Sequence, residues 1–252
     1  MSRTPIARVL STLREHRVQS LLMGGQACIL YGAAEFSRDA DLAVFASPGN
    51  LDRLKAALDD LDAVVVAVPP LDAEYLERGH AVHFRCRHPE AEGMRLDVMS
   101  KFRGVDPFAA LWERRTTFRL DDGFELDVLS LPDLVASKKT QRDKDWPMIR
   151  RLVEAHYDRF FGEPNDARIR FWLQELRTPE LLVECASRFP GAAVDLAGER
   201  PVLTSAVEGE EEPIAHLLAD EEAHERELDR TYWAPLRKEL EALRKQRRHR
   251  AR

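Results

Sequence analysis

The spacing of hydrophobic and polar residues divides the chain into a first part that mixes strands with helices and a second part of helices alone. Apolar residues recur at helical spacing over 4–16, and the short apolar run 18–23 is typical of a buried strand. A second amphipathic helix is expected at 26–34. Further strands are expected at 38–46, 63–68, 80–87 and 95–100, and as a hairpin over 116–129 around Asp121, Asp122 and Gly123.

From about residue 145 the pattern becomes helical. Helices are expected over 146–161, 166–176, 179–188 and 214–252. The intervening segment 190–213 contains proline, glycine and an acidic run, which predicts a loop with little regular structure. We therefore expect an α/β (α+β) fold, with a small mixed twisted β-sheet flanked by helices in a domain over 1–145. An all-helical C-terminal domain over 146–252 follows, ending in a charged helix.

Composition narrows the class of protein. The chain has 252 residues, 44% hydrophobic and 33% charged, which suffices for a packed core. Its three cysteines, Cys28, Cys86 and Cys185, are scattered, which argues against a zinc site or a disulfide framework. Residues 1–16 are too polar for a signal peptide, and no apolar run approaches the roughly 20 residues that cross a bilayer. We expect a cytoplasmic protein without a membrane partner.

The stretch 23–45 carries the chemistry. Gly24 and Gly25 follow the first strand at the start of a helix, and Asp39 and Asp41 lie one residue apart in the next strand. Because strand side chains alternate between the faces of a sheet, the two aspartates point the same way. Two adjacent carboxylates repel each other and are costly to desolvate, and a divalent cation removes that cost.

This order of strand, Gly-Gly, helix and Asp-x-Asp strand resembles the polymerase-β-type nucleotidyltransferase superfamily, whose members move a nucleoside monophosphate from a nucleoside triphosphate (NTP) onto an acceptor. That family carries a third carboxylate on a later strand, and Asp97 in RLDVMS is the best match, with Asp127 in ELDVLS as the alternative. The segment 107–145, with DLVASKKTQRDKD, is similar to bacterial minimal and toxin-type (AbiEii-like) nucleotidyltransferases. The resemblance covers roughly residues 17–150.

The resemblance implies the nucleotidyltransferase fold and a set of roles. Asp39, Asp41 and Asp97 are the expected catalytic residues and ligands of Mg²⁺, with two ions expected and Mn²⁺ as a substitute. Asp97 is also a candidate base for the acceptor hydroxyl. The expected nucleotide-binding residues are Gly24, Gly25, Ser37, Arg38, Lys138, Lys139 and Arg142.

The resemblance also implies partners. An NTP such as ATP is the expected donor, and a tRNA or a protein side chain is the favoured acceptor. A small hydroxylated molecule, as in antibiotic-modifying relatives, is an alternative. A toxin–antitoxin partner protein is another expectation, and a catalytically inactive nucleotide- or partner-binding protein on the same scaffold is the competing hypothesis. The basic tail 237–252 reads as a solvated helix end or an RNA-binding arm. His80 and His83 read as surface residues.

Overall fold

A computed structural model describes residues 4–120 and 123–250 of the chain. The chain divides into two compact units. The first comprises the described parts of Met1–Leu30, Ala34–Ser137 and Thr231–Arg252, and the second comprises Tyr31–Ala33 and Lys138–Arg230. The predicted domain boundary at residue 145 stays a prediction.

The first unit is built on a seven-stranded mixed sheet with the strand order β3-β4-β5-β2-β1-β7-β6. The β2–β5 and β1–β7 pairs are parallel, and the other four pairs are antiparallel. The strands are β1 (Ser20–Met23), β2 (Asp39–Val44), β3 (Val64–Val65), β4 (Val82–Arg85), β5 (Arg95–Met99), β6 (Thr116–Arg119) and β7 (Glu125–Val128). The predicted α/β class is therefore confirmed.

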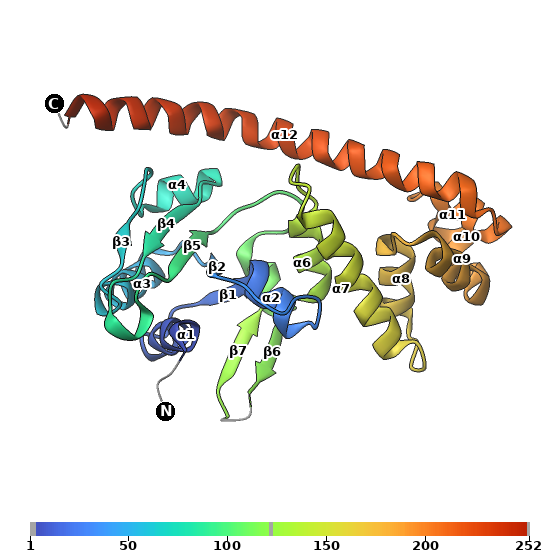
Figure 1. Cartoon of the computed structure of the whole chain (residues 1–252), viewed down its shortest axis with the longest axis horizontal. Helices are drawn as coiled ribbons and strands as arrows, with labels where there is room; N and C mark the ends of the chain where they lie inside the picture. Colours follow the sequence, from blue (N-terminus) through green and yellow to red (C-terminus); the bar gives the residue numbers. More distant parts are fainter. Residues whose placement is uncertain (1–3, 121–122, 251–252) are drawn as a thin grey trace. The chain divides into compact units, whose positions relative to one another are not determined.

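Helices surround this sheet, and Figure 1 shows α1 and α3 side by side next to it. Their apolar stripes, which include Val9, Leu13, Leu54 and Leu58, are buried in the core. The short helix α2 begins directly after β1 and packs against β1 and β2. The helices are α1 (Pro5–Glu15), α2 (Gly24–Leu30), α3 (Pro48–Asp60), α4 (Ala73–Arg78), α5 (Phe108–Glu113) and α6 (Leu131–Lys138), with a 3₁₀ turn η1 (Pro89–Ala91).

The predicted hairpin is present as the antiparallel β6–β7 pair, in which Thr117 faces Asp127. Asp121 and Asp122, which the sequence placed at its tip, lie outside the described residues. At the tip that is described, the amide of Gly123 donates to the carbonyl of Leu120. Gly123 has a φ of +78°, a conformation that glycine adopts without strain.

The second unit is helical, with a core that includes Trp172, Ile149 and Leu152, each fully buried. Arg200 lies inside it and donates to the carbonyls of Leu173 and Leu176. Its helices are α7 (Asp145–Phe160), α8 (Asp166–Glu175), α9 (Pro179–Arg188), α10 (Pro190–Ala197), α11 (Val202–Glu208) and the first part of α12 (Glu211–Arg250).

The expected loop over 190–213 is wrong, because α10, α11 and the start of α12 occupy this segment. Pro190 stands in the first turn of α10, where the missing amide proton costs no helical hydrogen bond. Gly209, with a φ of +76°, ends α11 and separates it from α12. The prolines and glycines that suggested a loop instead mark the ends of short helices.

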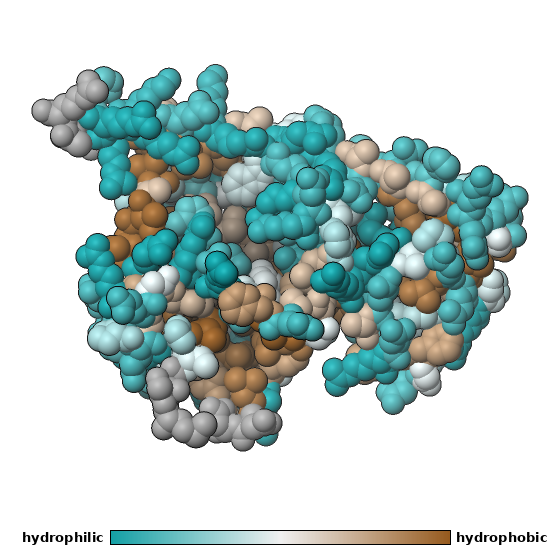
Figure 2. Space-filling model, viewed as in Figure 1, coloured by the Kyte–Doolittle hydropathy of each residue, from teal (hydrophilic) through white to brown (hydrophobic). Residues whose placement is uncertain are grey.

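The C-terminal part of α12 belongs to the first unit. Glu239 on this helix pairs with Arg78 and with His80, whose Nε2 lies 2.8 Å from the Glu239 carboxylate. His80 is fully buried, so its interpretation as a surface residue is wrong. Beyond this contact the basic side chains of 237–249 are exposed, and Figure 2 shows hydrophilic side chains over this end of the helix.

Candidate active site

The acidic residues predicted to bind metal gather on one face of the sheet. Asp41 is the register partner of Asp97 across the parallel β2–β5 pair. The even-numbered residues of β2 are buried on the opposite face, whereas Asp39 and Asp41 are half-buried, as the alternation predicts. The Asp97 side chain is 14% exposed. Two neighbouring strands thus present three carboxylates from one face.

The two glycines fit closely against this acidic face. Gly24 begins α2 with a φ of +67°, and a Cβ added there would lie 1.8 Å from Oδ2 of Asp41 and 2.7 Å from its Cβ. A Cβ on Gly25 would lie 2.5 Å from Oγ of Ser37. The turn between β1 and α2 therefore brings backbone directly beside Asp41, which only residues without a side chain permit.

Asp97 is held by two basic partners on the same face. Nε of Arg95 and Nδ1 of His83 each lie 2.8 Å from its Oδ1. Burial acts to raise the pKa of the Asp97 carboxyl, but hydrogen bonds from His83 and Arg95 outweigh burial, so the net pKa is lowered. The role of Asp97 as a base for the acceptor hydroxyl stays a prediction.

His83 was not expected in this site, and its side chain, predicted to lie at the surface, is partly exposed. It is the register partner of Asp97 on the antiparallel β4–β5 pair. The alternation over 80–87 placed His83 on the face opposite Val82 and Phe84. The alternation therefore identified the face on which His83 lies, but its place beside Asp97 also depends on the pairing of β4 with β5.

Arg95 lies among the three carboxylates. It is the register partner of Asp39 across β2–β5 and stands two residues before Asp97 on β5, so all these side chains share one face. The hydrogen bond to Asp97 is the main cause that raises the pKa of Arg95, and the charges of Asp97, Asp39 and Asp41 add to it. The Arg95 side chain is 42% exposed.

The fit of this site to a divalent cation is partial. Carboxylate oxygens are ligands that Mg²⁺ prefers, and the backbone of Gly24 lies close to the Asp41 carboxylate. However, among the described residues, no set of three His, Cys, Asp or Glu side chains is arranged to hold a metal ion. Asp39 and Asp41 supply suitable donors, and Oδ1 of Asp97 lies 2.8 Å from Nε of Arg95 and 2.8 Å from Nδ1 of His83.

Asp127, the alternative third carboxylate, lies elsewhere on the sheet. Its strand β7 is separated from β2 by β1. Its Oδ1 accepts hydrogen bonds from Nε of Arg115 at 3.0 Å and from Oγ1 of Thr117 at 2.7 Å. The structure therefore brings Asp97, and not Asp127, beside Asp41.

Of the other predicted nucleotide-binding residues, two flank the acidic strand. Oγ of Ser37 donates to the carbonyl of Asp39 at 3.2 Å, and the carbonyl of Ser37 accepts from Nε2 of Gln26. These bonds tie the segment before β2 to helix α2. Arg38 is exposed, and its guanidinium lies 5.8 Å from the ring centre of Phe36.

Lys138, Lys139 and Arg142 belong to the second unit, where each pairs with an acid of that unit. Lys138 is 9% exposed, with Nζ 3.8 Å from the carboxylate of Asp145. Nε of Arg142 lies 2.8 Å from the same carboxylate, and Nζ of Lys139 lies 2.8 Å from Glu175.

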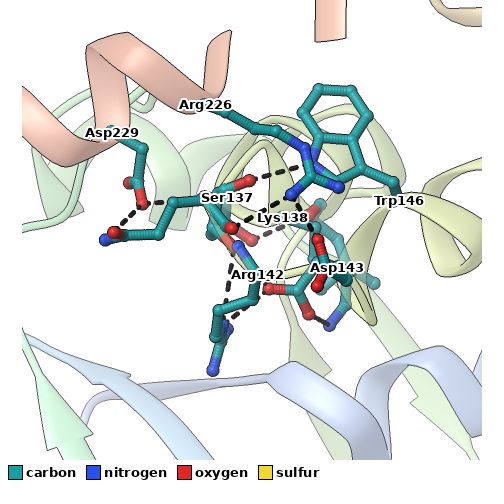
Figure 3. A network of polar contacts seen from close by, with 11 residues as sticks. Ser137, Lys138, Arg142, Asp143, Trp146, Arg226 and Asp229 are labelled. Carbon is teal, nitrogen blue, oxygen red and sulfur yellow. Dashed lines mark hydrogen bonds and ion pairs between the residues drawn. The ribbon is translucent and has the colours of Figure 1, made fainter. Parts of the chain in front are cut away.

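Lys138 and Arg142 belong to the polar network in Figure 3. There Arg226 donates to Asp143, and Asp229 accepts from the amide and side chain of Gln141. Lys138 at the end of α6 and Arg142 in the following turn therefore both contact the carboxylate of Asp145.

Comparisons with known proteins are sparse. No family model matches the chain, and no curated protein matches it. One solved structure that is similar is a crystal structure of a protein from H. pylori provisionally described as a nucleotidyltransferase. It shares 16% identity over 86% of this chain and 94% of that chain, with a TM-score of 0.38. Within the described part of the chain, no helix has both the length and the apolar content needed to cross a membrane. The functional assignment therefore rests on the geometry of the acidic face.

Proposed function

We propose that this protein transfers a nucleoside monophosphate from an NTP, such as ATP, to an acceptor. The observation that carries the proposal is the register pairing of Asp41 with Asp97 on parallel strands, with the Gly24 backbone packed against Asp41. Nucleotidyl transfer needs little covalent chemistry from the protein and depends on positioned charge, which clustered carboxylates and a cation provide.

Mg²⁺ is the proposed cofactor, with Mn²⁺ as a substitute. Asp39 and Asp41 would hold it, and Asp97 is the third candidate ligand. When bound, the ion would neutralise the charge that develops on the transferred phosphoryl group. Gly24 and Gly25 would let the backbone approach the triphosphate, with Ser37 and Arg38 nearby in sequence. Lys138, Lys139 and Arg142 are weaker candidates, because each already pairs with an acid.

The acceptor is proposed to be a tRNA or a protein side chain, as the resemblance to toxin-type, AbiEii-like enzymes suggests. A small hydroxylated molecule is the alternative acceptor. A cytoplasmic location and a partner within a toxin–antitoxin pair belong to the same proposal. The exposed basic residues of α12 would suit an RNA acceptor.

The deciding experiment incubates the protein with each α-³²P-labelled NTP, Mg²⁺, total tRNA and cell lysate. The label should enter one fraction (RNA, protein or small molecule), and that fraction identifies the acceptor. Asp41→Asn should abolish the incorporation without unfolding the protein. Asp127→Asn is the matched control and should retain it, because strand β1 separates the strand of Asp127 from β2.

The competing hypothesis, a protein that kept the scaffold without catalysis, draws on the ion pairs that hold Asp97. Calorimetric titration of each NTP with Mg²⁺ separates the two. Binding without incorporation would favour the inactive scaffold. A folded protein that binds none of the four NTPs would exclude both readings of the site.

A further inference from the structure

We propose that Arg95 is the resident counter-ion of the acidic face and competes with a divalent cation for the carboxylate of Asp97. The inference rests on the proposed function, because it concerns the same face. In this proposal Arg95 lowers the affinity of the nucleotide-free protein for a divalent cation.

The first step is the arrangement of four side chains. On one face of the parallel β2–β5 pair, Asp39 stands beside Arg95 and Asp41 stands beside Asp97. Arg95 and Asp97 are two residues apart on β5, and Nε of Arg95 lies 2.8 Å from Oδ1 of Asp97. The guanidinium and the three carboxylates therefore form one cluster of four charged groups on this face.

The second step is electrostatic. Three carboxylates this close repel one another unless a positive charge lies among them. The guanidinium supplies a permanent positive charge within the chain that interacts with all three carboxylates, beside Nδ1 of His83, which also lies 2.8 Å from Asp97. A divalent cation that takes Asp97 as a ligand would have to share the carboxylate with Arg95 at short distance, and the two positive groups would repel each other.

The third step concerns what the pairing permits. The Arg95 side chain is 42% exposed, so it can leave Asp97 without opening the core. A guanidinium also binds phosphate oxygens in a bidentate manner. A triphosphate would thus offer Arg95 a new anionic partner at the moment when Asp97 is needed by the metal. Metal binding by the protein alone should accordingly be weak.

The test is a titration of the full-length protein with Mn²⁺ alone, in which electron paramagnetic resonance measures the free ion. Arg95→Gln should bind Mn²⁺ at least about tenfold more tightly than the unmodified protein, because the competing charge is gone. Arg95→Met provides a second neutral variant should the first fail to fold. Arg95→Lys, which keeps the charge, should stay within about threefold of the unmodified protein.

Arg85→Gln is the matched control. Arg85 is exposed, is the register partner of Arg95 on the neighbouring strand β4, and has the same charge. Its removal should change the Mn²⁺ affinity much less than the removal of Arg95. The inference would be overturned if Arg95→Gln bound Mn²⁺ as tightly as the unmodified protein or more weakly. It would also be overturned if Arg85→Gln tightened binding equally, or if no variant bound Mn²⁺. The titration contains no NTP and no acceptor, so its result is independent of nucleotide transfer. A failure of the proposed function would appear in the incubation with labelled NTPs instead.

Discussion

Replacement of Gly24 by alanine tests how the β1–α2 turn supports the acidic face. The new Cβ would lie 1.8 Å from Oδ2, 2.5 Å from Cγ and 2.7 Å from Cβ of Asp41. A clash with a carboxylate oxygen alone could be relieved by rotation of the side chain. The Cβ of Asp41 is fixed to β2, so relief here requires the turn or the strand itself to move.

Two costs add in Gly24→Ala. The φ of +67° is unfavourable for alanine by about 1–2 kcal/mol. The steric overlap adds about 1–3 kcal/mol, as overpacking of a well-packed site usually does. The total loss of unfolding free energy is therefore about 2–5 kcal/mol. Asp41 would also be displaced from its place beside Asp97, so binding of Mg²⁺ with an NTP should be lost.

Gly93→Ala is the control, because Gly93 has a φ of +75° in the same unit, with no described atom within 4 Å of an added Cβ. It should lose only about 1–2 kcal/mol and retain nucleotide binding. Denaturant unfolding followed by circular dichroism measures both losses, and calorimetry measures binding. Equal destabilisation of the two variants, or undiminished binding by Gly24→Ala, would refute the close contact with Asp41.

Two further predictions concern the helical unit. Burial, together with two neighbouring arginines, lowers the pKa of His156 to about 4, and Nδ1 of His156 accepts a hydrogen bond from Nε1 of Trp172 at 2.9 Å. Stability that depends on neutral His156 is therefore complete above the ordinary histidine pKa near 6.5, and falling pH removes it down to about 4. We expect the unfolding free energy to fall by roughly 1–2 kcal/mol, a value reduced by the partial exposure of the ring. Urea unfolding of the unmodified protein at pH 7 and pH 4.5 should show this fall. An equal fall in His156→Gln would contradict the role of His156. Arg200 is 7% exposed, donates to two backbone carbonyls and pairs with Glu221. Arg200→Met should cost about 3–5 kcal/mol in urea unfolding, whereas the exposed Arg170→Met should cost under about 1 kcal/mol, and similar losses would contradict the buried role.

Local patterns predicted the parts of the site that lie within one strand. Alternation alone placed Asp39 and Asp41 on the same face, and the Gly-Gly pair at a strand-to-helix turn, and the structure confirms both placements. These features depend only on neighbouring residues, whose relative directions are set by the backbone of one element. The choice of Asp97 over Asp127 depended on the order of the strands along the chain, since the two strands have nearly the same local sequence.

The remaining features depend on strand pairing and helix packing, which local patterns do not contain. His83 reaches Asp97 because β4 and β5 pair in one particular register, and a shift by one residue would point it away. His80 is buried because Glu239, far along the chain, supplies a carboxylate for its ring. The helices over 190–208 were missed because proline and glycine were taken as loop signals, although proline is tolerated in the first turn of a helix.

The pairing of β5 with β4 and with β2, which local patterns do not predict, changes the chemical interpretation of the site. Considered without their neighbours, the three carboxylates would require a metal ion to neutralise their charge. The register shows that β5 also brings Arg95 beside Asp39, and that β4 brings His83 to Asp97. The acidic face therefore contains a positive charge of its own, and under the proposal above the binding of a cation would be an exchange with Arg95. Such an exchange would make the metal affinity depend on what else can bind the guanidinium, and the phosphates of an NTP would be such a group.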